Sequence, residues 1–255
     1  GDTHIYCGTS GWVSTVLDSQ ELDIGAMIAA IVGAQTGKYN YFAEMETAGK
    51  CLEWVKDHLA LDEIGIYLSK TDVAEGMEAR YTSLYDYMTE TVERVPPGAG
   101  GVIFTPWLHG NRCPFEDPDS AGMFIGIKLE TGKTELIRAV LEGVCLHPRW
   151  MLEAQATKVR ITDTIRFVGG GALSPVTCRI LADVLGRTVE TVDSPQNVGS
   201  VGAAAVMGVG LELIPSLDMV RDFVPVTASY APDPENKAVY DELFSVFKEL
   251  YKHNR

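Results

Sequence analysis

The first forty residues carry short runs rich in apolar residues that a glycine-bearing turn separates, which is a pattern of β-strands. Thr3–Cys7 and Trp12–Leu17 are two such runs, and the turn Gly8-Thr9-Ser10-Gly11 lies between them. We therefore expect a β-hairpin with a glycine-bearing turn. A third apolar run at Met27–Val32 predicts a further strand.

Longer stretches with apolar residues three and four positions apart predict helices. These stretches are Tyr41–Asp57, Val73–Val92 behind its capping residue Asp72, Lys133–Ala154, and a terminal amphipathic segment from Asp233-Pro234 to Leu250. Lys133–Ala154 has the clearest pattern, and Pro148 should kink this helix or divide it. A helix of small residues is expected at Gly199–Met207, where it can pack closely against a neighbour or a ligand.

Strands and helices alternate along the second half of the chain. After a Pro- and Gly-rich break at Val95–Gly101, strands are predicted at Val102–Phe104, Ile165–Val168 and Thr188–Val192. Together with the antiparallel start, this order indicates an α/β protein. The break is too short to mark a domain boundary.

The most informative segment is the glycine turn Gly169–Gly171, between the strand that ends at Val168 and the next helix. Glycines lack the Cβ atoms that would keep a phosphate or nucleoside away from the backbone, and a helix start offers free N–H groups. Ser174 is a good N-cap, Pro175 suits the first helical position, and Gly186 supplies the C-terminal stop. A plain tight turn explains the same glycines equally well, so the segment alone does not decide for a nucleotide.

The charge of the chain restricts its partners. The 255 residues carry a formal net charge of −14, whereas nucleic acid and anionic membranes require a basic surface, so we expect neither partner. No apolar run reaches the roughly 18 residues needed to cross a bilayer. The five cysteines lack Cys-x-x-Cys spacing, which is typical of reduced thiols in a cytoplasmic protein.

One similarity to a phosphate-binding P-loop fails on its spacing. Gly132-Lys133-Thr134 looks like the end of that loop, with Gly126 as its first glycine. Five residues separate Gly126 from Gly132, whereas the motif has four. A turn before a helix explains this segment.

Several segments together resemble the FGGY family of carbohydrate kinases. Gly122–Ile127, followed after seven residues by Glu135–Glu142, is similar to the second signature of that family. The other similar segments are Gly8–Gly11 (second phosphate motif), Pro106–Pro118 (the stretch before the signature), Gly169–Gly186 (adenosine motif) and Gly199–Ala204 (closing small-residue helix). Because they follow the family order over about residues 3–212, chance agreement is a poor explanation.

The resemblance implies the ribonuclease-H-like fold of actin-like ATPases, an α/β architecture with a mixed sheet flanked by helices. It implies that residues 1–255 are the C-terminal nucleotide-binding domain and that the N-terminal domain, with most of the sugar site and the catalytic aspartate, is absent from this chain. Asp2 lies too close to the first turn to be that base, so we assign no catalytic residue. ATP and Mg²⁺ are the implied cofactors, and no residue is assigned as a metal ligand.

By the same resemblance, the ATP contacts come from the two glycine turns and one helix. The expected ATP-binding residues are Gly8, Thr9, Ser10, Gly49, Glu53, Gly170, Gly171, Ala172 and Pro175. Glu53 departs from the glutamine of relatives, and its carboxylate would repel phosphates unless a metal bridges it or it turns away. Pro175 replaces an asparagine that some relatives use for adenine. For Gly49, helix packing is as good an explanation as nucleotide contact.

The predicted function is the ATP-binding half of a sugar kinase, which transfers the γ-phosphate of ATP to a sugar hydroxyl. The first substrate to expect is D-xylulose or a related ketopentose or polyol. A non-catalytic nucleotide-binding or interaction module is the alternative, because it can use the same turns. A dinucleotide-binding domain fits less well, because Gly169–Gly171 lacks the Gly-x-Gly-x-x-Gly spacing. A homodimer is compatible with either function.

Overall fold

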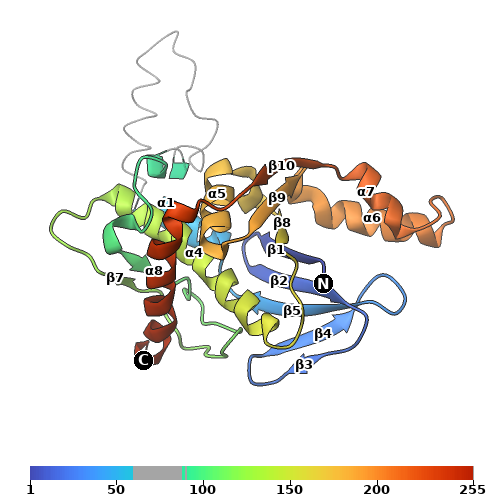
Figure 1. Cartoon of the computed structure of the whole chain (residues 1–255), viewed down its shortest axis with the longest axis horizontal. Coiled ribbons are helices and arrows are strands. Elements are labelled where there is room, and N and C mark those ends of the chain that lie inside the picture. The colour runs from blue at the N-terminus through green and yellow to red at the C-terminus, as the bar shows by residue number, and fades with distance from the viewer. Residues whose placement is uncertain (60–87, 90, 255) are drawn as a thin grey trace, which may run out of the picture.

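A mixed eight-stranded sheet forms the centre of the molecule (Figure 1). The structure is a computed structural model and describes residues 1–59, 88–89 and 91–254. The strands lie in the order β10-β9-β8-β1-β2-β5-β4-β3. Their bounds are β1 Thr3–Cys7, β2 Gly11–Leu17, β3 Leu22–Asp23, β4 Ile28–Val32, β5 Tyr39–Met45, β8 Thr164–Val168, β9 Thr188–Val192 and β10 Val226–Tyr230.

The sheet has an antiparallel half and a parallel centre. β1 pairs antiparallel with β2, and β2, β5, β4 and β3 continue in the same way. On the other side β1 pairs parallel with β8, and β8 pairs parallel with β9, before the antiparallel edge strand β10. β6 (Ile103–Phe104) and β7 (Phe124–Ile125) form a separate two-stranded sheet.

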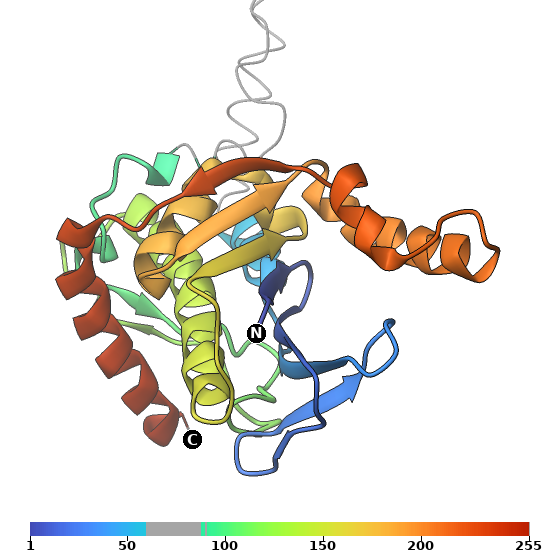
Figure 2. The same ribbon diagram turned by 45° about the vertical axis from the view of Figure 1, so that its right-hand side comes forward.

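Helices cover one face of the central sheet and one of its edges. Their bounds are α1 Gly49–His58, α4 Lys133–Ala156, α5 Pro175–Leu185, α6 Val198–Gly210, α7 Val220–Phe223 and α8 Lys237–Leu250. The long helix α4 contacts β2 and β5, α5 packs between α4 and β9, and α8 packs on α4 and α5 (Figure 2). α6 and α7 extend away from the sheet beyond β9 and β10.

The buried amide of Gln155 joins α4 to the sheet. Its Nε2 group donates to the carbonyl oxygens of Val13 (3.1 Å) and Tyr41 (2.8 Å), and its Oε1 accepts from the Thr15 hydroxyl at 2.8 Å. A buried amide is stable only when its donors and acceptors are paired, as they are here. This contact fixes α4 across β2 and β5.

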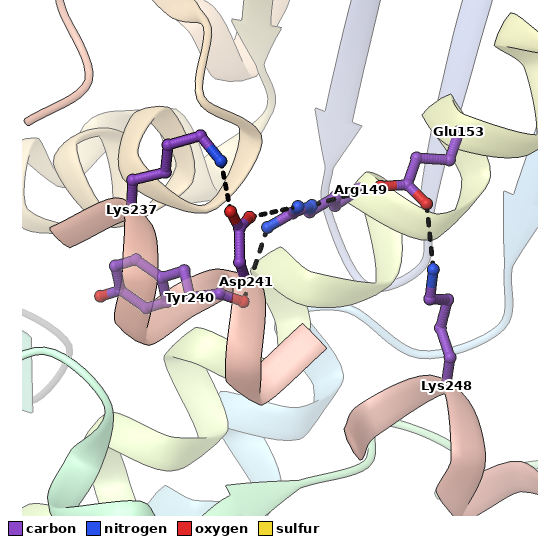
Figure 3. A network of polar contacts seen from close by, with 6 residues as sticks. All are labelled: Arg149, Glu153, Lys237, Tyr240, Asp241 and Lys248. Carbon is purple, nitrogen blue, oxygen red and sulfur yellow. Dashed lines mark hydrogen bonds and ion pairs between the residues drawn. The ribbon is translucent and has the colours of Figure 1, made fainter. Parts of the chain in front are cut away.

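Ion pairs hold α8 against α4 (Figure 3). The Arg149 guanidinium on α4 bonds the Asp241 carboxylate on α8 at 2.6 Å, and Lys248 bonds Glu153 at 3.2 Å. The charged ends of Arg149 and Lys248 both lie 4.3 Å from the ring centre of Phe244. These contacts border the apolar face through which α8 buries Phe244 and its neighbours.

A second, buried network ties α4 to α8 and to the loop after residue 95. Glu142 Oε1 accepts from Arg138 Nε at 2.7 Å, from the Tyr240 hydroxyl at 3.0 Å and from the Gly98 N–H at 3.0 Å. Burial raises the pKa of Glu142, while Arg138 and the other donors favour the charged form. The network is structural, since it binds three segments of the fold together.

Most of the predicted elements are confirmed. The hairpin, the strands at Thr188–Val192 and Ile165–Val168, and the helix capped by Ser174 and stopped by Gly186 all form, and the α/β class is correct. Ser174 Oγ accepts from the Thr177 N–H at 3.2 Å, and Gly186 adopts φ 62°. The predicted helix Val73–Val92 and its cap Asp72 lie largely outside the described residues.

The structure differs from the elements expected from the sequence at three places. Tyr41–Asp57 is not one helix: β5 occupies Tyr39–Met45, because its alternating side chains pair with β2 and β4, and α1 starts at Gly49. Pro148 does not divide α4, because that helix is buried on all sides along its middle and packing holds it together. β10 was not predicted; it is a mostly exposed strand that, among the described residues, pairs with β9 alone.

Candidate functional site

The turn between the central strands β1 and β2 lies at the end of the sheet where β1 finishes. The Gly8 N–H bonds the Ser10 carbonyl at 2.9 Å, which closes the turn and exposes Thr9. Within the described part of the chain, the backbone N–H groups and hydroxyls of Thr9 and Ser10 have no hydrogen-bond partner. Four donors on two adjacent residues can therefore bind phosphate oxygens.

The N-terminus of α1 docks directly on this turn. The Gly49 N–H donates to the Gly8 carbonyl at 2.7 Å, and the Ala48 and Lys50 N–H groups donate to the Thr9 carbonyl at 2.9 and 3.2 Å. The turn carbonyls thus cap a helix that has no side-chain cap. A Cβ atom on Gly49 would lie 2.5 Å from the Gly8 oxygen. Gly49 is therefore a packing glycine that positions the turn, and its own N–H is already used.

The second glycine turn, Gly169–Gly171, follows β8 and lies beside the first turn. Tyr6 of β1 pairs with Val168 of β8, so these parallel strands end together. Gly169 has φ +93°, and a Cβ atom there would lie 2.5 Å from the Cys7 carbonyl oxygen; on Gly171 it would lie 2.8 Å from Cys7 Sγ. Both glycines allow the second turn to pack closely on β1.

Gly170 differs from its two neighbours. A Cβ atom built on it would meet no atom within 4 Å, so this residue faces open space. A flat ligand can lie against its backbone without displacing any part of the protein. Gly170 is thus the glycine of the second turn whose surface is free for a nucleotide.

The remaining predicted residues lie around these two turns. Ala172 is buried in the short 3₁₀ turn Gly170–Leu173, and its carbonyl accepts from the Cys178 thiol at 3.6 Å. Pro175 is exposed at the first position of α5. Glu53 lies one turn along α1 from Gly49 and bonds Lys50 at 2.8 Å, with its side chain 37% exposed. Its carboxylate is therefore paired with a lysine.

Cys7 connects the site to the core. It directly precedes Gly8, and its atoms lie against both Gly169 and Gly171. Burial raises the pKa of its thiol to about 12, so Cys7 is neutral and does not act as a nucleophile. All five cysteines are free and buried, consistent with the reduced thiols that we predicted.

An aromatic cluster beside the first turn was not found from the sequence. Tyr6 and Trp12 stack with their ring centres 3.9 Å apart, and the hydroxyl end of Tyr6 reaches the Gly8 position. Trp12 Nε1 donates to His4 Nε2 at 3.2 Å, and burial lowers the pKa of His4. These side chains belong to the sheet face opposite α4, because residues alternate along β1 and β2. Alternation alone predicts a shared face, but it does not predict the stacking.

Arg112 is the second feature that sequence reasoning missed. Its guanidinium bonds Glu44 of β5 at 3.0 Å and also pairs with Glu46. Glu44 pairs across the sheet with Trp12, and Trp12 is two residues after Ser10. One cation and two carboxylates are therefore placed near the first glycine turn, Gly8–Gly11. The two glutamates raise the pKa of Arg112, which stays charged. No local signal links residues this far apart in the chain.

The donor set fits the phosphates of a nucleotide but includes no preformed metal site. Across residues 1–59, 88–89 and 91–254, no group of three or more His, Cys, Asp and Glu side chains is placed to hold a metal ion. The same residues contain no helix that is long and apolar enough to span a bilayer. A magnesium ion at this turn would therefore have to take most of its ligands from phosphate oxygens and water.

Comparison with known proteins gives one family. The sequence model described as "FGGY family of carbohydrate kinases, C-terminal domain" matches residues 4–211. A gluconokinase of Bacillus licheniformis is 29% identical over 253 residues, which is 98% of this chain and 47% of the relative. A xylulose kinase of Bacillus subtilis (strain 168) is 24% identical over 256 residues, or 100% of this chain and 47% of the relative.

Solved structures show the same fold. The ligand-bound xylulose kinase from Lactobacillus acidophilus superposes with a TM-score of 0.81 at 22% identity, covering 99% of this chain and 47% of the other. The predicted actin-like ATPase fold is thereby confirmed. The chain spans about half the length of the curated relatives that it matches.

Proposed function

The chain belongs to the FGGY family of carbohydrate kinases, and on that premise we propose that it is the ATP-binding C-terminal half of a sugar kinase. The observation that carries this proposal is that the two glycine turns lie side by side at the ends of the central strands β1 and β8. Thr9 and Ser10 offer unpaired donors there, and Gly170 offers bare backbone. These are the groups that a nucleotide phosphate chain and its ribose require.

In this proposal, each residue of the site has a defined task. The N–H and hydroxyl groups of Thr9 and Ser10 hold the terminal phosphate, with Gly49 keeping their turn in place. Gly170 and Gly171 accept the nucleoside side of ATP, next to Ala172 and Pro175. Bound Mg²⁺ would neutralise charge on the phosphates, and phosphoryl transfer depends on such positioning and neutralisation. Glu53 stays paired with Lys50 and therefore out of the phosphate region.

The acceptor is a sugar or polyol hydroxyl, and the proton-accepting base is proposed to lie in a region N-terminal to this chain. D-xylulose is the first substrate to test, because the sequence suggested a ketopentose and several relatives are named xylulose kinases. Gluconate is the second, because the relatives also include gluconokinases of similar identity. The fold is common to both and does not choose between them.

A coupled assay of ADP release tests this function. The full gene product is incubated with Mg-ATP and a panel of D-xylulose, D-ribulose, gluconate and glycerol. We expect one of these to give turnover well above the ATP-only control, and the 255-residue chain alone to give none. ATP binding without turnover on any sugar would support a non-catalytic nucleotide-binding module instead.

A further inference from the structure

Arg112 is an exposed cation on a loop whose backbone is fixed on both sides of it. Its neighbours in the chain, Asn111 and Cys113, are buried. The Asn111 amide donates to the carbonyl oxygens of Cys113 (3.2 Å) and Phe115 (2.8 Å). The Cys113 carbonyl also bonds the ring of the buried His147 at 2.8 Å. The backbone that carries Arg112 is therefore held in place before any ligand binds, as a precise binding residue requires.

Two glutamates hold the guanidinium of Arg112 at the end of β5. Arg112 Nη1 donates to Glu44 Oε2 at 3.0 Å, and its Nε pairs with Glu46 Oε1. The side chains of Glu44 and Glu46 are 32% and 26% exposed, so a solute can reach them. Within the described part of the chain, the other oxygen of each carboxylate has no hydrogen-bond partner. This charged trio therefore holds one cation and two anions, and it keeps two acceptor oxygens free.

The order of the strands places the charged trio on one particular side of the proposed ATP site. β8, β1, β2 and β5 are neighbours in that order (Figure 1). Gly170, at the nucleoside end, follows β8, whereas the terminal phosphate is proposed to lie at the turn between β1 and β2. Gly11 pairs with Met45 and Trp12 with Glu44, so the end of β5 lies directly beside that turn. The trio and Gly170 are thus on opposite sides of the phosphate turn.

Phosphoryl transfer gives this arrangement a meaning. The acceptor oxygen forms its bond to phosphorus opposite the oxygen of ADP, whose bond to phosphorus breaks. Acceptor and ADP therefore lie on opposite sides of the terminal phosphate. With the nucleoside beside β8, the acceptor is expected beside β5, next to the charged trio.

The charges of the trio favour an uncharged acceptor. The carboxylate of a sugar acid would enter a region in which negative charge exceeds positive charge, and the guanidinium of Arg112 is already paired with both glutamates. Such a ligand is repelled. The hydroxyls of a neutral sugar or polyol can instead donate hydrogen bonds, and carboxylate oxygens only accept them. The free oxygens of Glu44 and Glu46 therefore match hydroxyl groups.

We propose that Arg112, Glu44 and Glu46 select the phosphoryl acceptor, and that this acceptor is an uncharged ketose or polyol and not a sugar acid. Arg112 orients the two carboxylates, and these accept hydrogen bonds from acceptor hydroxyls. The inference rests on the proposed function, because it requires the terminal phosphate of ATP at Thr9 and Ser10. It adds a substrate class that the relatives leave open, since they include both xylulose kinases and gluconokinases.

Acceptor kinetics of the full gene product at saturating Mg-ATP test this inference. The panel is D-xylulose, D-ribulose, glycerol and gluconate, with D-glucitol added as the neutral counterpart of gluconate. We expect the highest kcat/KM for a neutral acceptor and a value at least about tenfold lower for gluconate. A kcat/KM for gluconate that equals or exceeds the value for every neutral compound would overturn the inference and leave the proposed function intact. No turnover on any acceptor would contradict the proposed function, and the inference with it.

Charge-removing substitutions give a readout that a merely structural role would not move. Glu44→Gln and Glu46→Gln each keep the shape of the side chain and remove one negative charge. Each should raise kcat/KM for gluconate relative to the best neutral acceptor by about fivefold, and high salt should shrink this gain. Because the ratio compares two acceptors on one variant, a loss of folded protein does not alter it.

Glu249→Gln is the matched control for these substitutions. It makes the same chemical change on α8, where Glu249 is exposed and pairs with Lys252, so the ratio should stay as in the parent. A ratio that is unchanged in both Glu44→Gln and Glu46→Gln, or that rises equally in Glu249→Gln, would overturn the assignment of acceptor selection to the charged trio.

Discussion

The carbonyl oxygen of Cys7 lies so close to Gly169 that a Cβ atom on residue 169 would be only 2.5 Å from it, and Gly169 is held at φ +93°. Gly169→Ala should therefore destabilise the fold by about 2–4 kcal/mol, because both the backbone conformation and the contact with β1 are lost. Denaturant unfolding measures this free energy.

Gly170→Ala is the matched control for that substitution. Residue 170 has open space around it and no positive φ, so its unfolding free energy should change by less than about 0.5 kcal/mol. Similar losses for both variants would contradict the distinct roles of these two glycines.

Gly49→Ala should disturb the first turn from behind. Its Cβ atom would press on the Gly8 carbonyl and weaken the 2.7 Å bond between α1 and the turn, at a cost of about 1–3 kcal/mol. Calorimetric titration should also show weaker binding of Mg-ATP. Glu53→Gln removes only an exposed pair with Lys50, so both quantities should barely change. A large loss of affinity in Glu53→Gln would show instead that this carboxylate takes part in binding.

Arg112→Met should raise the KM for ATP of the full enzyme several-fold. The substitution removes the cation that pairs with Glu44 and Glu46 near the Gly8–Gly11 turn, so their negative charges repel the phosphates of the nucleotide. Because Arg112 is 58% exposed, stability should fall by less than about 1 kcal/mol. Adding Glu44→Gln should restore part of the affinity, and high salt should shrink the difference. A KM that is insensitive to salt in both proteins would rule out this electrostatic role.

Buried His147 should make stability depend on acid pH. Trp107 donates to its Nδ1 and its Nε2 group bonds the Cys113 carbonyl, and burial lowers its pKa from 6.5 to about 4. The unfolded chain binds the proton on His147 more tightly than the folded chain does. The free energy of unfolding therefore keeps its full value above pH 6.5 and decreases as the pH falls toward 4. The loss amounts to about 3 kcal/mol.

Unfolding curves of the protein and of His147→Gln between pH 4 and 7 measure that contribution. The variant should be less stable at pH 7 and should vary less with pH in this range. Parallel pH profiles for the two proteins would show that His147 does not titrate as proposed.

Local signals predicted a large part of the fold. The cap at Ser174, the stop at Gly186 and the two apolar-rich runs of β1 and β2 on either side of a glycine turn are each formed by a few neighbouring residues, so the sequence shows them directly. β5 was mistaken for the start of a helix, because its pattern makes sense only with β2 and β4 beside it. The same reason explains the missed contact between Arg112 and Glu44, which are 68 residues apart.

The glycines show the same division within the site. Sequence similarity selected Gly49, Gly170 and Gly171 together, but only their surroundings separate packing from exposure. Gly49 and Gly171 lie against Gly8 and Cys7, whereas Gly170 is open. A conformational requirement and a binding surface look alike in a string of glycines, and the tertiary contacts distinguish them.

Two-dimensional NMR of the backbone amides during titration with Mg-ATP tests the central claim most directly. The account predicts that the Thr9, Ser10 and Gly170 signals shift together with one dissociation constant, and that Gly170→Val weakens binding about tenfold or more while the protein stays folded. Mg-ATP that shifts only amides far from both turns, or that binds Gly170→Val as well as the unchanged chain, would contradict it.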